Sequence, residues 1–222
     1  MILRVEAIAK SYKRKEVLKN VSFQADKGTC IGILGGNGAG KSTLLSILAG
    51  IQTPDAGSFT FNGFDLLKDE SKRSALVGYV PQGIPLIPEL SAKDNLLLWY
   101  DRKTLTTELE SGILKLLGIG EFLNVPVKKM SGGMKKRLSI GCAMVGKPPI
   151  LLLDEPTAAL DLLCKRDIAR YLEAYTNAGG IVIMTTHDVT ELSACDACYI
   201  MKDGQLKPYL YDGDVHSLIE QL

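Results

Sequence analysis

The chain has 222 residues, of which 46% are hydrophobic and 23% are charged, the composition of an ordinary globular protein rather than of a disordered tail. Its 26 Lys and Arg residues against 25 Asp and Glu leave a net charge of +1, which excludes the basic footprint of a general nucleic-acid binder, so no nucleic-acid partner is expected. The length predicts one domain over residues 1–222, with room for a small lobe.

The cellular compartment is indicated by the lack of a membrane-spanning run and of a signal peptide, and by the cysteines. No apolar run approaches the eighteen or so residues that span a bilayer, and charges interrupt the first apolar residues, unlike a signal peptide. The scattered, odd set of cysteines is typical of free thiols in a reducing compartment. The pair Cys195 and Cys198 has no second pair to complete a zinc site and no thioredoxin-like setting. The sequence predicts a cytoplasmic protein. The cysteines are Cys30, Cys142, Cys164, Cys195 and Cys198.

The first sixty or so residues predict an antiparallel β subdomain. Residues 5–9, 17–24 and 58–62 are strand-like, and turn signals stand at residues 26–28 and 62–63. We expect this β patch to lie beside the core.

A phosphate-binding loop follows the apolar run at residues 29–34. Residues 35–42 read Gly-Gly-Asn-Gly-Ala-Gly-Lys-Ser, fit G-x-x-x-x-G-K-[ST] and open a helical run at residues 42–48. The glycines let backbone N–H groups turn inward around phosphate oxygens, Lys41 reaches the β- and γ-phosphates, and Ser42 offers a hydroxyl to Mg²⁺. By itself the loop indicates a nucleoside triphosphate, and it leaves kinases, GTPases, helicases and transport ATPases open.

The rest of the chain predicts a doubly wound α/β core with a mainly parallel sheet. Further runs that are mostly apolar throughout, as strands buried on both faces are, alternate with helical patterns. The runs cover residues 76–80, 150–153, 181–184 and 199–201, and the helical patterns cover residues 109–117 and 168–175. Residues 83–130 contain no convincing strand and two helical stretches, at 92–100 and 106–117, and so predict a helical subdomain at about 83–146.

Polar residues follow two of these strands. Asp154 and Glu155 end the run at 150–153, where Asp154 can hold Mg²⁺ and Glu155 can lie against an attacking water. His187 follows the run at 181–184, at the end of a strand where open α/β sheets bind ligands, and is expected to meet the γ-phosphate. The alternative for Asp154 and Glu155 is a solvated acid pair at a strand end, and the alternative for His187 is a structural role. His216 is expected on the surface.

A second anion site is indicated at residues 131–138. Ser131 can cap a helix, Gly132 and Gly133 permit close approach, and basic residues fill the first turns. A flexible hinge is the alternative for the glycines.

With these motifs in order, nearly the whole sequence resembles the ATP-binding subunit of an ABC transporter. The resemblance identifies residues 35–42 as the Walker A loop, residues 79–82 as the Q-loop, residues 131–133 as the signature core, residues 150–155 as Walker B, residues 159–161 as the D-loop and His187 as the switch histidine. Tyr12 matches the aromatic that stacks on adenine, with plain packing as its alternative. Gly36 replaces the commoner proline, and Met130 and Met134 flank the signature in place of Leu and Gln, but the serine and glycines remain.

The resemblance implies a phosphate-loop ATPase in which two chains, as a homodimer or heterodimer, pack head to tail around ATP and Mg²⁺. The implied ATP contacts within one chain are Tyr12, Gly35, Gly36, Asn37, Gly38, Ala39, Gly40, Lys41, Ser42, Thr43 and Gln82. The contacts to the ATP of the other chain are Ser131, Gly132, Gly133 and Asp161. The catalytic residues are Glu155, His187 and Lys41, and the metal-site residues are Ser42, Gln82 and Asp154.

The resemblance also implies a separate membrane permease as partner, with this chain peripheral on the cytoplasmic face of the cell membrane. The run Ser-Gly-Gly-Met-Lys-Lys-Arg-Leu, and the 48 residues between Gln82 and Ser131, are similar to those of drug, lipid and sodium exporters. Residues 85–88 and 96–99 are apolar and either meet the permease or form the lobe's own core. A non-transport ABC ATPase acting on nucleic acid or ribosomes is the alternative function, although no paired cassette, coiled coil or zinc module is apparent. A nucleotide kinase would not explain Ser131 and the glycines after it, and an intact Glu155 disfavours a catalytically inactive subunit.

Overall fold

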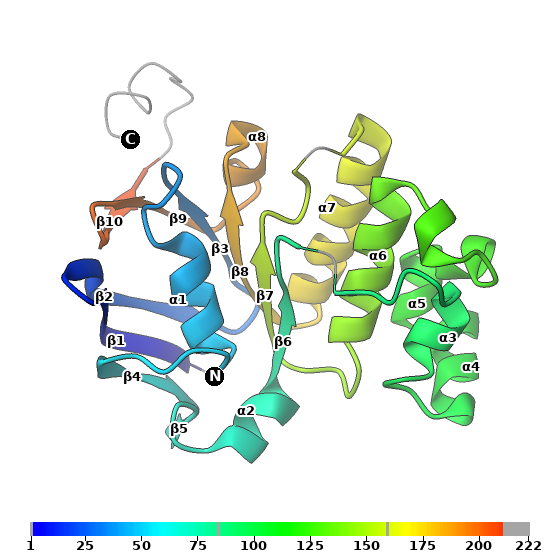
Figure 1. The fold of residues 1–222 in the computed structure, drawn as a ribbon, viewed down its shortest axis with the longest axis horizontal. Helices are drawn as coiled ribbons and strands as arrows, with labels where there is room; N and C mark the ends of the chain where they lie inside the picture. The colour runs from blue at the N-terminus through cyan, green and yellow to red at the C-terminus, as the bar shows by residue number, and fades with distance from the viewer. Residues whose placement is uncertain (1, 84, 159, 211–222) are drawn as a thin grey trace.

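The computed structural model describes residues 2–83, 85–158 and 160–210. His216 and Ala159, two residues of the sequence interpretation, lie outside these ranges. Two sheets, with helices on both sides of the larger one, make up the described part (Figure 1).

The smaller sheet is antiparallel, as predicted, and has the order β2-β1-β4-β5. Its strands are β1 (Ile2–Tyr12), β2 (Lys15–Asp26), β4 (Ala56–Phe61) and β5 (Phe64–Asp65). Burial alternates along β2, with Val21, Phe23 and Ala25 inside and the residues between them exposed. This period of two buries one face of the sheet and leaves the other in water.

The larger sheet has the order β10-β9-β3-β8-β7-β6, and its neighbours are parallel except for β9 and β10. Its strands are β3 (Cys30–Leu34), β6 (Val77–Val80), β7 (Ile150–Asp154), β8 (Ile181–Thr186), β9 (Ala197–Lys202) and β10 (Gln205–Tyr209). Every residue of β3, β7 and β8 is buried. The predicted mainly parallel sheet is confirmed, because unbroken apolar runs suit strands covered on both faces.

Two hydrophobic cores lie on the two faces of this sheet. On one face Ile150 and Leu152 pack with α1 (Lys41–Leu48) and the antiparallel sheet. On the other face Leu151 and Leu153 pack with α6 (Gly132–Ala143) and α7 (Leu162–Asn177). Figure 1 shows α1 and α6 on opposite sides of β7. The phosphate loop and the signature helix of one chain are therefore separated by the sheet.

The predicted helical insertion contains α3 (Ala92–Leu96), α4 (Arg102–Glu110), α5 (Ile113–Leu116), η1 (Ile119–Phe122) and η2 (Val127–Lys129). In the described part of 83–130 the only β pairing is the isolated bridge between Ser91 and Pro126. Its assignment as a subdomain within a single domain stays a prediction.

The prediction of one continuous helix over residues 106–117 was wrong, because the chain forms α4 and α5 there with a break between them. Glu108, 3% exposed, folds back and accepts a hydrogen bond from the Ile113 N–H at 2.8 Å. A β-carbon on Gly112 would stand 2.0 Å from Glu108 Oε2, so the chain turns at this glycine and begins a new helix. Lys147 Nζ, 2.9 Å from Glu108 Oε1, compensates the buried carboxylate.

Other boundaries differ by short segments. The helix expected over residues 92–100 ends at Leu96, and Leu76 ends α2 (Glu70–Leu76) instead of beginning a strand. Neither α2, which has no buried residue, nor the edge strand β10 was predicted. Both lack the apolar pattern on which such predictions depend. The short helix α8 (Val189–Leu192) follows β8.

Candidate functional site

The phosphate loop joins β3 to α1. Gly38 and Gly40 have φ values of +77° and +111°, which favour glycine, and Gly40 occupies the N-cap position of α1. A β-carbon on Gly35 would stand 2.4 Å from the Met201 carbonyl oxygen, so this position also excludes a side chain. No side chain of the described residues caps α1. The free N–H groups of its first turn therefore suit phosphate oxygens.

A hollow of about 350 Å³ lies over this loop. Residues 36–39 form one wall, and the start of β2 with residues 201–204 forms the others. Thr43 is half-buried in α1, and Ser42 is exposed.

Lys41 is 6% exposed and its ammonium points back along the loop. Its Nζ donates to the carbonyl oxygens of Gly35 at 2.7 Å and Gly36 at 3.2 Å. Burial lowers the pKa of Lys41, and the carboxylates of Glu155 and Asp154 oppose this shift by favouring the charged form. The lysine is thus held by the loop that it is expected to serve.

Asp154 and Glu155 leave the end of β7 in different environments. Asp154 is 2% exposed and stands opposite Thr185 of β8 in the parallel register. Glu155 has left the strand with φ +48°, a left-handed conformation uncommon for a side-chain-bearing residue. The two neighbouring acids therefore lie in different environments, and their separate roles stay a prediction.

Gln82 and His187 converge on the Glu155 carboxylate. Gln82 Nε2 donates to Oε2 at 3.0 Å, and His187 Nε2 lies 2.8 Å from Oε1. His187 Nε2 is also 3.3 Å from Lys41 Nζ. One ring nitrogen cannot donate to a carboxylate and accept from an ammonium together, so the shorter contact assigns a proton to Nε2. Gln82 and His187 thus meet at the Glu155 carboxylate, and Lys41 is joined to it through His187.

Thr185, absent from the sequence interpretation, joins the two acids. Its side chain is fully buried, its Oγ1 donates to Asp154 Oδ1 at 2.6 Å, and it accepts from the Glu155 N–H at 3.0 Å. The only sequence signal was the place of Thr185 at the end of an apolar strand. Its role depends on the register between β7 and β8, which the sequence does not display.

Replacing Thr185 by valine keeps the shape and removes both hydrogen bonds. We expect Thr185→Val to lower the free energy of unfolding by about 1–3 kcal/mol, because the buried Asp154 carboxylate loses its donor, although the Glu155 N–H keeps its bond to the Thr185 carbonyl oxygen at 3.2 Å. A misplaced acid pair should also lower kcat by about tenfold or more. Denaturant unfolding and steady-state ATP hydrolysis measure the two effects. Thr185→Ser should restore kcat, and equal kcat for valine and wild type would contradict the positioning role.

A second overlooked residue is Lys136 of the signature helix. It is 4% exposed, and its Nζ donates to the carbonyl oxygen of Pro81 at 3.3 Å. Burial lowers the pKa of Lys136, while the charges of Asp154 and Glu155 oppose the shift. This lysine ties α6 to the residue before Gln82.

The signature residues lie at the start of α6, away from the phosphate loop of the same chain. Ser131 caps the helix by accepting from the Met134 N–H at 3.2 Å. A β-carbon on Gly133 would stand 2.2 Å from Cys164 Sγ, whereas Gly132 is exposed. Asp161 caps α7 by accepting from the Cys164 N–H at 2.9 Å. That hydrogen bond is the main reason that the pKa of Asp161 is lowered.

Tyr12 ends β1, opposite Lys15, which lines the hollow over the loop. Its ring is 44% exposed and its hydroxyl bonds to Gln52 Oε1. Tyr12 itself does not line that hollow, so the contact with adenine stays a prediction.

If Tyr12 stacks on the base, Tyr12→Ala should weaken ATP binding by roughly 1–3 kcal/mol. Tyr12→Phe is the matched control, because it keeps the ring and loses only the bond to Gln52. Calorimetric titration with ATP measures both variants. Equal affinity of Tyr12→Ala and wild type would assign Tyr12 to packing.

The two apolar segments of the helical insertion divide between core and surface. Leu96 is fully buried, whereas Leu98, Trp99 and Ile87 are 57%, 61% and 43% exposed. Asn95 accepts from the Ile87 N–H at 2.9 Å and donates to its carbonyl oxygen at 3.2 Å, so the two segments lie together. Leu96 therefore belongs to the lobe's own core, whereas contact of the exposed residues with a permease stays a prediction.

Comparison with known proteins gives consistent matches. The family model described as "ABC transporter" matches residues 18–158. The linearmycin resistance ATP-binding protein LnrL of Bacillus subtilis is 35% identical over 210 residues, which are 92% of this chain and 68% of that protein. The Nod factor export ATP-binding protein I of Sinorhizobium fredii is 35% identical over 219 residues, 96% of this chain but 63% of that longer protein.

Among solved structures, the ATP-binding cassette MJ0796, a dimer in a post-hydrolysis state with ADP and phosphate, superimposes with a TM-score of 0.83. It is 27% identical, and the match covers 96% of this chain and all of that one. None of the helices within residues 2–83, 85–158 and 160–210 is long and apolar enough to cross a bilayer.

Proposed function

Since this chain belongs to the ABC transporter family and carries its ATPase domain, we propose that it is the subunit that drives export through a separate membrane permease. The observation that carries the proposal is the convergence of Lys41, Gln82 and His187 around Glu155, beside the phosphate loop. The relatives LnrL and Nod factor export protein I are longer than this chain, which covers 68% and 63% of them, so we do not assign their substrates to this chain.

In the proposed reaction ATP binds with its β- and γ-phosphates at the N-terminus of α1. Lys41 turns its ammonium from the loop carbonyls to the phosphates and offsets the charge that develops in the transition state. Glu155 accepts the proton of the attacking water. Because Gln82 and His187 both contact Glu155, they can link the orientation of this base to the γ-phosphate.

The residues proposed for Mg²⁺ fit a hard cation that prefers oxygen ligands. Asp154 offers a buried carboxylate oriented by Thr185, Ser42 an exposed hydroxyl at the first turn of α1, and Gln82 an amide oxygen. Bound there, Mg²⁺ would neutralise phosphate charge during hydrolysis.

We further propose that two cassettes, either two copies of this chain or this chain and a related one, close head to tail around ATP. The sheet separates α1 from α6 in one chain, so Ser131, Gly132, Gly133 and Asp161 would meet the nucleotide of the partner. The dimeric state of MJ0796 supports this arrangement. ATP then stabilises the closed state through its higher affinity for it.

The permease would dock on the exposed part of the helical insertion, where Ile87, Leu98 and Trp99 offer apolar surface. The chain would then lie on the cytoplasmic face of the membrane. The alternative, an ATPase acting on ribosomes or nucleic acid, predicts a different partner for the same cassette.

Two measurements in cells that lack the native gene test export. The wild-type chain should sediment with membranes and be released at alkaline pH without detergent, whereas sedimentation with ribosomes would favour the alternative. Cells without the chain should accumulate more of at least one apolar compound from an antibiotic panel. Wild type should reverse this accumulation and Glu155→Gln should not. If no compound responds although the purified chain hydrolyses ATP, the ATPase assignment stands and export does not.

A further inference from the structure

Three of the five cysteines, Cys30, Cys195 and Cys198, gather where β3, α8 and β9 meet. Cys30 Sγ and Cys195 Sγ are 3.6 Å apart although 165 positions separate them. Cys198 contacts Cys195 from the neighbouring strand. The ATPase reaction uses none of these thiols.

Two hydrogen bonds between Cys30 and Asp196, the residue after Cys195, hold the two cysteines side by side. The Cys30 N–H donates to Asp196 Oδ2 at 2.8 Å, and the Asp196 N–H donates to the Cys30 carbonyl oxygen at 2.9 Å. A β-carbon on Gly32 would stand 2.8 Å from Cys195 Sγ, so this glycine leaves room for the thiol. The sulfur contact therefore follows from strand pairing and does not depend on side-chain packing alone.

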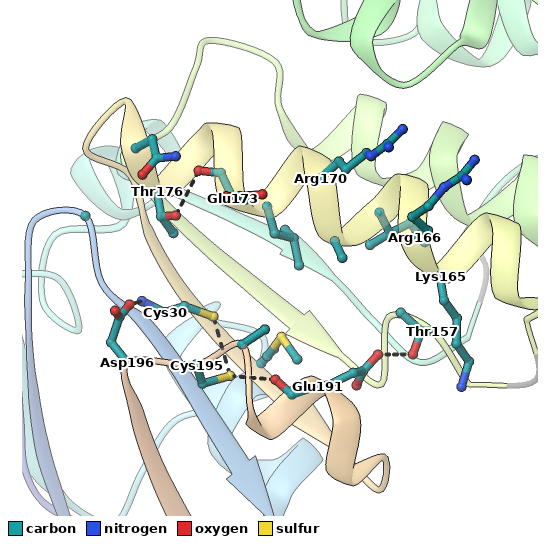
Figure 2. Close-up of a pocket in the computed structure, with 17 residues that line it drawn as sticks. Cys30, Thr157, Lys165, Arg166, Arg170, Glu173, Thr176, Glu191, Cys195 and Asp196 are labelled. Carbon is teal, nitrogen blue, oxygen red and sulfur yellow. Dashed lines mark hydrogen bonds between the residues drawn. The ribbon is translucent and has the colours of Figure 1, made fainter.

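The pair borders a hollow on one side, with Cys195 half-buried and Cys30 buried. Cys30 and Cys195 line a hollow of about 660 Å³ between α7 and the region of β3, β8 and α8. Figure 2 shows the two sulfur atoms facing each other on one side of the hollow, with Arg166 and Arg170 of α7 on the other side. The Cys195 thiol also contacts the Glu191 carbonyl oxygen at 3.3 Å, which keeps it directed into this region.

We propose that Cys30 and Cys195 are a reversible modification site that closes to a disulfide when it reacts with a low-molecular-weight disulfide. The sulfur atoms need to approach by about 1.5 Å to reach the S–S bond length of about 2.05 Å.

The reaction is a thiol–disulfide exchange in two steps. One thiolate of the pair attacks a sulfur of the oxidant RSSR, forms a mixed disulfide and expels RS⁻. The other thiolate then attacks the protein sulfur of that mixed disulfide and expels the second RS⁻. The two thiol protons end on the two RSH molecules, so the pair is oxidised by two electrons and RSSR is reduced.

Cys198 is the competing partner for Cys195. The Cys195 thiol lowers the pKa of Cys198 through a hydrogen bond. Hydrogen bonds with Cys198 and with Cys30 raise the pKa of Cys195. Cys198 itself bonds to the Leu192 carbonyl oxygen at 3.4 Å. Cys142 is a matched control, because it lies on α6 and burial raises its pKa to about 12.

The test incubates the full-length chain with oxidised glutathione, blocks free thiols under denaturing conditions and identifies linked peptides by mass spectrometry. Wild type should lose two hydrogen atoms in its intact mass and yield a peptide that links Cys30 to Cys195. Cys142→Ser and Cys198→Ser should close the same link, and dithiothreitol should reverse it. Cys195→Ser and Cys30→Ser should not form it.

The oxidised Cys198→Ser variant should also melt at a higher temperature than its reduced form, since a disulfide between residues 30 and 195 restricts the unfolded chain. A link between Cys195 and Cys198, a stable glutathionyl adduct on Cys195, or five unreacted thiols in the wild type would each overturn the proposal.

Discussion

Glu155→Gln should reduce ATP hydrolysis by at least about 100-fold, because the amide cannot accept the proton of the attacking water. Lys41, Ser42 and Asp154 remain to hold MgATP, so binding should persist. ATP would then accumulate between two chains, and the closed dimer should become the main species. Size-exclusion chromatography with light scattering, with and without MgATP, measures this shift.

The substitution has one structural consequence beyond the lost base. Both carboxylate oxygens of Glu155 contact donors, Gln82 Nε2 and His187 Nε2. A glutamine amide must turn its own N–H₂ toward one of them, so one contact is lost. We expect the loss to fall on hydrolysis more than on nucleotide affinity, because neither contact involves the phosphate loop.

Two further variants separate the roles of the acids. Asp154→Asn should lose hydrolysis without a gain in dimer, because it weakens the Mg²⁺ site itself. Ser131→Arg added to Glu155→Gln should block closure by placing bulk at the partner's phosphate. Wild-type hydrolysis in Glu155→Gln would contradict the base assignment. An inactive variant that stays monomeric at every ATP concentration would contradict the homodimer, and would leave a different cassette or the permease as the closing partner.

Lys41→Ala should weaken ATP binding by about 100-fold, equivalent to roughly 3 kcal/mol for lost charge-assisted hydrogen bonds to phosphate. The lysine is the fixed charge that residues 35–42 bring to the β- and γ-phosphates. Calorimetry measures the affinity. Lys72→Ala, which removes an exposed lysine paired with Asp69 on α2, is the control and should bind ATP as wild type does.

Mixing variants tests whether this lysine and the signature act on one ATP from different chains. Lys41→Ala and Ser131→Arg should each be inactive alone. A mixed dimer has one intact composite site, so an equimolar mixture should recover up to about a quarter of the wild-type rate. No recovery, with both variants folded and able to exchange subunits, would contradict the head-to-tail site. Unchanged affinity in Lys41→Ala would remove the phosphate loop from the binding site.

The features that the sequence by itself determined are those encoded by neighbouring residues. The phosphate loop needs glycines, a lysine and a serine at fixed spacing, and the structure has it between a buried strand and a helix. Unbroken apolar runs identified β3, β7 and β8 because burial on both faces excludes polar side chains from the strand. The same local logic placed Asp154 and Glu155 at a strand end.

Only the tertiary structure decided which of these residues touch one another. Thr185 reaches Asp154 across 31 positions because β7 and β8 pair in one register, and a shift of one residue would turn it away. Cys30 meets Cys195 for the same kind of reason, through the pairing of β3 with β9. The break at Gly112 depends on how Glu108 is buried against Lys147. Such contacts depend on how segments that are distant in sequence pack together. The spacing of residues within one segment does not specify that packing.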